Sequence, residues 1–550
     1  MRVLEKIAEP STLVMATTSG IALGLNAPGY GTHLIGLVAL FPFFLVLDRI
    51  HQSPVSLFRK LCHIFLVCWL TGFWGAVLGT HWMIHCIHYF GGVSWLLAFI
   101  ITGVGYGLIV AIVLFFCFAL PVFFIKHRTW WNIPLRLSYF LAVEPFIPHL
   151  FPWTFGGLTF SGVPWISQVA DLVGEHGLGF FSIGENFLLL LLWRRKTDHA
   201  VDVRIVQRLA GGFLLVFGIA LAYGAWRSID LGKHLNQGSL LRVAAIQPNF
   251  TPGPMLHNPA LSYSTRQRNL PDLIENSRTA LQHFPSDALA PKLVVWPEST
   301  YPSAYFKHNK DRQLVEQFAR DHNTAVLLQS VDWERSNNRY RYYGIAVLVG
   351  EDGRVIGRYD KISLMPFGEY LPGEGLFRSL RGWLGSQFHN MSEFEAGKEF
   401  TVFSLPGGLC LASSICFDAF SPEVIPQMVR NGAELVINLS NLAWFGKSNA
   451  SRQIEMALRW KAIENRVPVL YSSNSGETVL INALGEDASE RLGLFRVGSF
   501  SENLALQRRY SFYREHTRSV QAFFTGLFVF VAILAHLRGR AFSGEDKASG

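Results

Sequence analysis

Charged residues are scarce in this chain. They make up 16% of its 550 residues, against about 25% in a typical soluble domain, whereas hydrophobic residues make up 50% and the mean hydropathy is +0.25. This balance excludes an ordinary soluble protein and indicates a membrane protein with a water-soluble portion large enough for its own core. The net charge of +8 does not indicate nucleic-acid binding, because the basic residues fall mostly between apolar segments.

Cysteine is also rare, and its spacing excludes several kinds of site. No CxxC or Cys/His spacing typical of zinc is present. Cys410 and Cys416 fall in one expected strand, which would hold them about 20 Å apart, too far for a disulfide. We therefore expect no structural disulfide, no metal and no cofactor. The six cysteines are Cys62, Cys68, Cys86, Cys117, Cys410 and Cys416.

Long apolar runs, by contrast, are abundant. Eight segments are candidates for spanning a bilayer, which takes about 20 apolar residues, although the fifth and sixth are short or interrupted. The first lacks the small-residue cleavage site of a signal peptide, so we expect it to remain as a helix. The segments lie at about 11–28, 33–48, 63–82, 93–125, 137–152, 165–193, 207–226 and 520–537.

Lys and Arg are missing from alternate connections. The short connections after the first, third and fifth spans contain none, whereas basic residues flank the other ends of the spans. By the positive-inside rule both termini are cytoplasmic, and the long region between spans seven and eight lies outside, on the periplasmic face of a bacterium. The expected parts are a transmembrane domain of about seven helices (1–229), an extracytoplasmic domain (230–515), and a last transmembrane helix with a cytoplasmic tail (516–550).

Three histidines, His81, His85 and His88, surround Trp82 at the outer end of the third span. They could bind a metal, but no acidic residue lies near them in the sequence. We favour their interpretation as polar residues at the membrane rim, where His and aromatic side chains collect.

The region 240–510 alternates short apolar runs with more polar stretches. Continuous apolar strands separated by helices indicate sheets covered by helices. A hairpin turn is expected at Glu351-Asp-Gly353, and Pro422 is expected in the first turn of a helix. Strands are predicted over 241–248, 292–298, 324–330, 342–349, 354–362, 409–416, 433–439 and 467–473, and helices over 263–284, 309–322 and 451–465.

Three reactive side chains stand where predicted strands end: Glu298, Lys361 and Cys416. Each has an ordinary explanation, because a lone Cys is usually a small buried hydrophobe, a Glu can favour a helix start and a Lys can be a surface cation. Strand ends are, however, where function collects in layered α/β folds. The presence of all three at such ends favours one common site.

These residue types suit acyl chemistry. A carboxylate in an apolar pocket can have its pKa raised enough to take the proton of a thiol. The thiolate of Cys416 can then attack a carbonyl. The ammonium of Lys361 can stabilise the resulting oxyanion, together with the backbone N–H groups that follow the cysteine.

The residues around these three resemble the Glu–Lys–Cys triad of the nitrilase superfamily. The segment Lys361–Pro372 is similar to the triad-lysine segment of the apolipoprotein N-acyltransferases, membrane enzymes that complete bacterial lipoprotein maturation. The resemblance covers essentially the whole chain, including eight spans with one extracytoplasmic domain before the last. Its motifs are Trp296-Pro-Glu298, Tyr359-Asp-Lys361, Ser414-Ile-Cys-Phe-Asp418, Ile87-His-Tyr-Phe-Gly-Gly92, Phe151-Pro-Trp-Thr-Phe-Gly156 and Asn441-Leu-Ala-Trp-Phe-Gly446.

The resemblance implies a multi-pass α-helical membrane domain and a four-layer αββα nitrilase-like domain, located at a bacterial inner membrane. It implies that Glu298 deprotonates Cys416, which takes an acyl chain from a membrane phospholipid as a thioester while Lys361 stabilises the tetrahedral intermediates. The chain would then pass to the N-terminal amine of the diacylglyceryl-cysteine of an apolipoprotein. Residues expected to support the triad are Glu369, Phe417 and Asp418.

Several positions depart from the family's pattern. Phe417-Asp418 stands where the family usually has Tyr-Glu, which removes a hydroxyl and shortens the acidic side chain. Leu442 stands where the family commonly has Asp, and Arg452-Gln-Ile454 replaces an expected Gln-His pair. No Trp follows Gln247, where relatives often carry one. These departures leave the donor and acceptor open, so a divergent member acting on another lipid or amine is an alternative.

Two further functions remain open from the sequence. A membrane-tethered nitrilase-type amidase would use the same triad to hydrolyse a small amide, but eight spans are more than an anchor needs. A non-enzymatic protein that binds lipids or lipoproteins would not need an intact triad. Acyl transfer from a labelled phospholipid separates the acyltransferase from both, and activity that survives Cys416→Ala excludes both enzymes.

Overall fold

The computed structural model contains two compact units. The first comprises Met1–Ile84, Ser94–Arg227 and Glu515–Gly550 and is helical; the second comprises His85–Val93 and Ser228–Arg514 and holds the strands of both sheets. The residues described are 10–124, 132–147, 151, 154–197, 201–251, 259–285, 290–336, 339–370 and 394–548.

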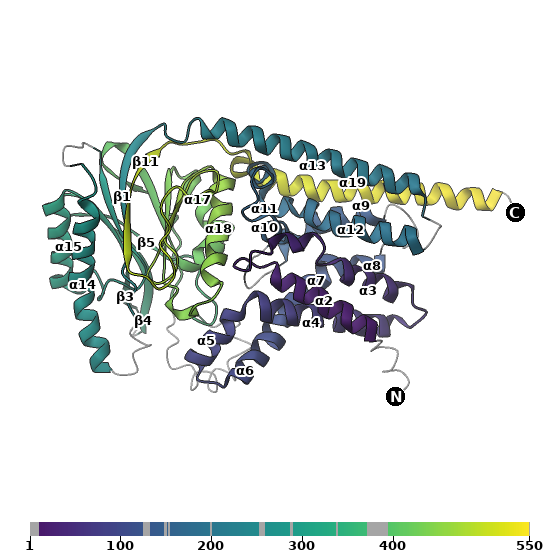
Figure 1. The fold of residues 1–550 in the computed structure, drawn as a ribbon, viewed down its shortest axis with the longest axis horizontal. Coiled ribbons are helices and arrows are strands. Elements are labelled where there is room, and N and C mark those ends of the chain that lie inside the picture. Colours follow the sequence, from purple (N-terminus) through teal and green to yellow (C-terminus); the bar gives the residue numbers. More distant parts are fainter. Residues whose placement is uncertain are drawn as a thin grey trace. The chain divides into compact units, whose positions relative to one another are not determined.

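The helical unit contains the long apolar helices that the sequence predicts (Figure 1). Within the described residues, five helical runs are long and apolar enough to cross a membrane, and the pair α11–α12, bent by 75°, makes a sixth if it is one span. The five runs are His33–Gln52, Leu57–Gly79, Trp95–Phe124, Val203–Gly232 and Phe512–Leu537.

The helices of this unit, some of which continue into the second, differ widely in length. Their bounds are α2 (Pro10–Leu25), α3 (Phe41–Gln52), α4 (Leu57–Gly79), α5 (His81–Gly91), α6 (Trp95–Ile100), α7 (Gly107–Leu114), α8 (Pro121–Phe124), α9 (Asn132–Val143), α10 (Phe155–Phe160), α11 (Ala170–Gly177), α12 (Gly179–Thr197), α13 (Val203–Gly232) and α19 (Phe512–Ala548).

The expected count of eight spans is not confirmed. The first expected span is α2, which has 16 residues, and the fifth is α9, which has 12. After α9 the chain forms a short 3-10 turn containing Pro145, a residue that cannot continue helical hydrogen bonding. The sixth is broken between α11 and α12, and within α11 Gly174 takes a non-helical conformation. Hydropathy alone does not register these breaks.

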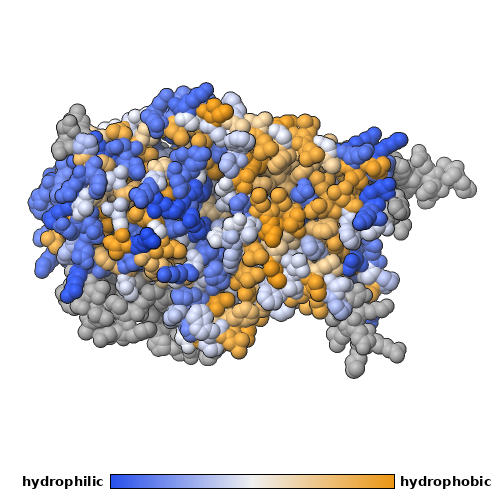
Figure 2. Space-filling model, in the orientation of Figure 1, coloured by the Kyte–Doolittle hydropathy of each residue, from blue (hydrophilic) through white to orange (hydrophobic). Residues whose placement is uncertain are grey.

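Apolar side chains gather over the surface of these helices (Figure 2). Large hydrophobic residues that are more than half exposed include Leu214, Leu215, Ile219, Phe523 and Phe530. A soluble domain rarely leaves such a surface open to water. The lipid phase of a membrane is the environment in which this surface is stable.

The second unit contains two sheets. The six-stranded sheet has the order β11-β1-β2-β3-β4-β5 and the five-stranded sheet the order β10-β9-β8-β7-β6. The strands are β1 (Ser239–Gln247), β2 (Lys292–Trp296), β3 (Ala325–Ser336), β4 (Arg339–Val349), β5 (Val355–Asp360), β6 (Phe403–Ser404), β7 (Cys410–Ile415), β8 (Leu435–Ser440), β9 (Val469–Ser473), β10 (Val479–Ile481) and β11 (Gly498–Leu506).

The two sheets pack face to face between helices (Figure 1). Alternate residues of each strand point to opposite faces. On β1, Val243 joins the core between the sheets, which also contains Leu411 and Ile437 of the second sheet. Ala244, the next residue, joins a separate core beneath helices α14 (Pro259–Leu281) and α15 (Asn309–His322). Helices α17 (Val424–Arg430) and α18 (Ala450–Asn465) cover the second sheet.

The strand and helix predictions for this unit are confirmed, with shifted ends, but three strands are missed. β6 and β10 have only two and three residues, and β11 is a polar strand that pairs antiparallel with β1 at the sheet edge, so none gives an apolar run. The prediction for Pro422 is wrong, because α17 begins at Val424 and a 3-10 turn over Cys416–Phe420 precedes it.

Candidate active site

The three reactive residues follow strands whose ends meet. β5 runs in the same direction as β2, because β2 and β3 are parallel and two antiparallel pairings follow. Glu298 lies just beyond β2, and Lys361 directly follows β5, so both stand at one edge of the six-stranded sheet. Cys416 directly follows β7 of the facing sheet.

Cys416 occupies a strained corner of the backbone. Its φ of +47° lies in the left-handed region, which a residue with a Cβ adopts at a cost of about 1–2 kcal/mol. The strain persists because the surrounding turn is tightly bonded. The side chain of Asp418 accepts a hydrogen bond from the N–H of Ile415 (2.9 Å), and Asn438 Nδ2 donates to the carbonyl of Cys416 (3.3 Å). The conformation presents the thiol at the end of the strand.

The carboxylate of Glu298 is fixed near this thiol. This carboxylate accepts a hydrogen bond from the backbone N–H of Asn441 at 2.8 Å, and it interacts electrostatically with the Cys416 thiol. Burial raises the pKa of Glu298 to about 7, although the positive charge of Lys361 opposes the shift. A carboxylate with this pKa can accept a proton at neutral pH and is a stronger base than an ordinary glutamate.

Lys361 is buried, with 2% of its side chain exposed, and donates to Glu369 Oε1 at 2.8 Å. Burial alone would lower the pKa of Lys361, but the negative charges of Glu369 and Glu298 outweigh it, so that the pKa is raised. Glu369 is itself fixed by the N–H of Met365, which donates to Oε2 at 2.7 Å. Lys361 therefore remains a fixed cation beside the Cys416 thiol and the Glu298 carboxylate.

Asp418 joins the ends of two strands in opposite sheets. Besides the bond from Ile415 at the end of β7, it accepts hydrogen bonds from the Tyr359 hydroxyl of β5 (2.8 Å) and the N–H of Ser363 (2.7 Å). Burial raises the pKa of Asp418 to about 6, with Lys361 opposing the shift. Asp418 thus holds the segment around Lys361 next to the turn that contains Cys416.

Phe417 remains a candidate supporting residue of a different kind. It is half-buried, and its ring packs against Phe420 with the ring centroids 5.4 Å apart. It therefore adds apolar packing to the turn that carries the cysteine.

Sequence reasoning missed the residues that hold Glu298 and the Cys416 turn. Asn441 supplies the N–H that binds Glu298, and Asn438 binds the cysteine carbonyl. Asn441 begins the quoted Asn441-Leu-Ala-Trp-Phe-Gly446 motif, which was a usable signal. Asn438 lies inside the buried strand β8, where a buried amide among apolar residues is the only signal.

The His85–Val93 segment belongs to the same unit as the triad. The Cys86 thiol donates to the carbonyl of Trp444 at 3.2 Å, and the ring of His85 lies against Gly446. Within the described residues no group of His, Cys, Asp and Glu could hold a metal ion. The segment contacts the loop that begins at Asn441.

We expect Gly446→Ala to disturb this contact. Gly446 has a φ of +60°, and a Cβ on it would lie 2.7 Å from Cε1 of His85, so both the backbone and the imidazole ring must move. The left-handed backbone alone should cost about 1–2 kcal/mol. Thermal unfolding in detergent and the alkylation rate of Cys86 measure the effect.

Gly408→Ala is the matched control, because Gly408 has a φ of +79° with nothing within 4 Å of an added Cβ. It should lower the unfolding temperature without exposing Cys86. Equal Cys86 reactivity in both variants would contradict the contact with His85.

Two of the motifs that carry the family resemblance lie only partly within the described residues. Residues 152–153 of the 151–156 motif and residues 371–372 of the triad-lysine segment lie outside them.

Comparison with known proteins matches both parts of the chain. The carbon-nitrogen hydrolase model matches residues 242–500, and the model of the apolipoprotein N-acyltransferase N-terminal domain matches residues 19–188. The first match agrees with the nitrilase-like α/β architecture of the second unit. A solved amidase from Nesterenkonia sp. is 20% identical, with a TM-score of 0.36, covering 49% of this chain and 92% of its own.

Curated relatives are similar over most of their length. The apolipoprotein N-acyltransferase of Geobacter metallireducens is 28% identical over 86% of this chain and 85% of its own. Those of Azotobacter vinelandii and Chlorobaculum tepidum are 29% and 26% identical, over 90% and 95% of this chain and 89% and 96% of their own. Since the two family models match in order and relatives of one name align along nearly the whole sequence, the chain belongs to the apolipoprotein N-acyltransferase family of the nitrilase superfamily.

Proposed function

We propose that this N-acyltransferase moves a fatty acyl chain from a membrane phospholipid, through a thioester on Cys416, to the N-terminal amine of the diacylglyceryl-cysteine of an apolipoprotein. The observation that carries the proposal is that the thiol of Cys416 at the end of β7 interacts with the buried carboxylate of Glu298, whose pKa burial raises to about 7. Lys361 stands beside this pair as a buried cation.

In the first half-reaction Glu298 takes the thiol proton and Cys416 Sγ attacks the ester carbonyl of the phospholipid. The tetrahedral intermediate carries its negative charge beside Lys361. The carbon–oxygen ester bond breaks, the proton held by Glu298 passes to the leaving alkoxide, and a lysophospholipid departs. The acyl chain remains on sulfur as a thioester.

In the second half-reaction the neutral amine of the acceptor attacks the thioester carbonyl, and Glu298 takes the amine proton. The carbon–sulfur bond breaks, the thiol is restored, and the amide product is more stable than the thioester. Two chemically similar attacks therefore use one base and one oxyanion site in turn.

The membrane location follows from the substrates. Both donor and acceptor are lipids, and the helical unit offers a broad apolar surface for a bilayer (Figure 2). We place the enzyme in the inner membrane of a bacterium, with both termini cytoplasmic and the triad on the periplasmic side, because of the alternation of basic residues between spans.

The test is transfer itself. The purified chain in detergent micelles is mixed with phospholipid bearing a radiolabelled acyl chain and with a synthetic diacylated lipopeptide. We expect label in an amide of the lipopeptide, and none with Cys416→Ala. Release of free labelled fatty acid without lipopeptide labelling would instead indicate a hydrolase, and transfer that survives Cys416→Ala would exclude the thioester route.

A further inference from the structure

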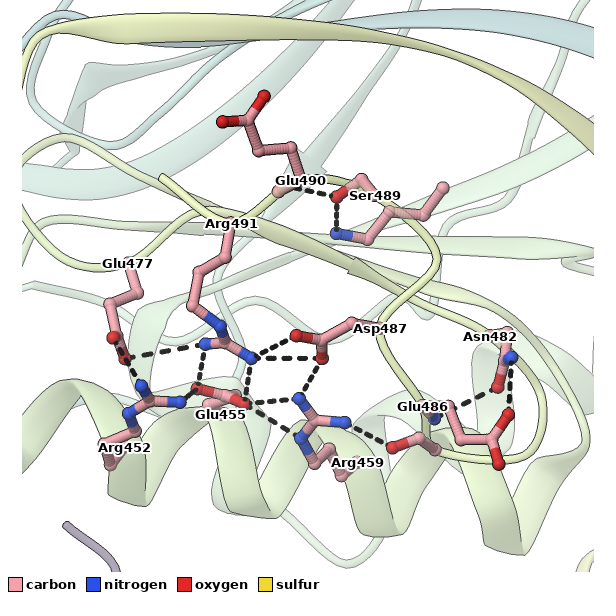
Figure 3. Close-up of polar contacts among 12 residues, drawn as sticks. Arg452, Glu455, Arg459, Glu477, Asn482, Glu486, Asp487, Ser489, Glu490 and Arg491 are labelled. Atoms are coloured by element: carbon pink, nitrogen blue, oxygen red, sulfur yellow. Dashed lines mark hydrogen bonds and ion pairs between the residues drawn. The ribbon is translucent and has the colours of Figure 1, made fainter. Parts of the chain in front are cut away.

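A dense group of ion pairs joins α18 to residues 477–491, outside the triad (Figure 3). At its centre is Glu455, 3% exposed. Its carboxylate accepts hydrogen bonds from Arg459 (2.6 and 2.8 Å), Arg491 (2.7 and 3.0 Å) and Arg452 (3.1 Å). Burial alone would raise the pKa of Glu455, but the arginines outweigh it and lower the pKa. The Glu455 cluster comprises Arg452, Glu455, Arg459, Glu477, Asp487 and Arg491.

Glu477 lies in the connection between β9 and β10 and links this connection to the cluster. Its Oε1 pairs with Arg452 at 2.9 Å, and its backbone N–H donates to Ser451 Oγ at 3.0 Å. Ser451 Oγ also lies 3.2 Å from the hydroxyl of Tyr471 on β9. Both the backbone and the side chain of Glu477 are therefore held by the first turn of α18.

The residues just before Glu477 hold the loop that contacts the base. The backbone N–H of Asn474 donates to the carbonyl of Ser440 (3.0 Å), and its side-chain Nδ2 donates to Asn441 Oδ1 (3.2 Å). Asn441 is the residue whose N–H binds Glu298 at 2.8 Å. Gly476 allows the close packing here, since a Cβ on it would lie 2.5 Å from a neighbouring hydroxyl oxygen.

We propose that the Arg452–Glu477 ion pair of the Glu455 cluster, acting through Asn474, positions the peptide N–H of Asn441 that holds Glu298. The proposal rests on the proposed function for the role of Glu298 as base. Arg452, Glu477 and Asn474 are positioning residues in it, because none of them contacts the thiol or the base directly in the interactions described above.

The expected consequence has a defined sign. The N–H of Asn441 donates to the charged form of Glu298 and so lowers its pKa, against the larger effect of burial. If the 474–477 segment loosens, this hydrogen bond lengthens and the pKa of Glu298 rises further. The base is then available only at higher pH. If the cluster served only the stability of the fold, substitutions in it would lower stability and yield but would not move the pH midpoint at which Cys416 becomes reactive.

The experiment measures the alkylation of Cys416 by iodoacetamide from pH 5 to 9 on the full chain in detergent micelles. Fragmentation mass spectrometry assigns the label to Cys416 rather than Cys410, which shares its tryptic peptide. This probe needs neither phospholipid nor acceptor. Glu298→Gln establishes that the midpoint reports the base, since the variant should lose the titration near pH 7.

We expect Asn474→Ala to raise the midpoint by about one pH unit, the size of one lost hydrogen bond to a charged carboxylate. Arg452→Met, at a side chain that is 42% exposed, should raise it by a smaller amount. Arg452→Lys should restore the wild-type midpoint, because lysine can still pair with Glu477.

Asp487→Asn is the matched control. It removes a carboxylate of the same cluster that binds Arg459 and Arg491, and it should leave the midpoint unchanged. Midpoints equal to wild type in folded Asn474→Ala and Arg452→Met would overturn the proposal. A titration that persists in Glu298→Gln would instead overturn the assignment of the base, and with it this proposal, while acyl transfer in the separate assay could still succeed.

Discussion

Glu298→Gln should lower the rate of Cys416 acylation by about 100- to 10,000-fold, the usual contribution of a general base. Glutamine is close to glutamate in shape and can still accept the hydrogen bond from Asn441, so the fold should be kept. What it cannot do is take the thiol proton. Burial raises the pKa of the Cys416 thiol well above its ordinary value, so almost no thiolate forms without the base.

The pH dependence gives this prediction a second readout. Because burial raises the pKa of Glu298 to about 7, its basic form grows as the pH rises through 7, and the wild-type acylation rate should rise over the same range and then level off. Stopped reactions at a series of pH values, read by mass spectrometry, measure it. A wild-type profile that is flat through pH 7, or is the same in Glu298→Gln, would contradict the role of Glu298.

Lys361→Met should also have a large effect, on both rate and stability. Loss of the cation beside the intermediate should lower the acylation rate by about 100- to 1,000-fold. It also leaves Glu369 without its buried partner at 2.8 Å, and breaking one side of a buried pair costs about 3 kcal/mol. Acylation rates and thermal unfolding in detergent measure the two effects separately.

Two variants separate catalysis from stability. Lys361→Met combined with Glu369→Gln removes both charges and should recover most of the lost stability while leaving the rate low. Lys461→Met breaks another buried Lys–Glu pair, with Glu464 at 3.5 Å on α18, and should lower stability without lowering the rate per folded molecule. A double variant that recovers the rate would mean that Lys361 serves only to neutralise Glu369.

The sequence predicted the apolar strands and the ends at which the reactive side chains stand. Buried strands such as β2 and β7 are runs of apolar and small residues, and Glu298 and Cys416 stand just beyond their ends. The same reasoning could not find β11, whose register with β1 is set by pairing between residues far apart in the chain. Nor could it find the 3-10 turn at Cys416, because hydrogen bonds to Asp418 from two strands define it.

The surroundings of the triad were less predictable than its members. Asp418 was expected to support the triad, but its bonds to Tyr359 and Ser363 across the two sheets depend on the tertiary fold. The sequence marked Arg452 only as a position where the family's expected Gln-His pair is replaced, and it did not indicate an ion pair there. Its partner Glu477 lies far along the chain, and single-sequence patterns carry no information on such pairs.

The most direct test of the account is the intact mass of the purified chain after incubation with phospholipid alone. The thioester route predicts an added mass equal to one acyl chain, located on Cys416, absent in Cys416→Ala and removed by a diacylated lipopeptide with formation of an amide. A chain that transfers acyl groups to the lipopeptide yet shows no adduct on Cys416 at any time, even when quenched in acid, would contradict it.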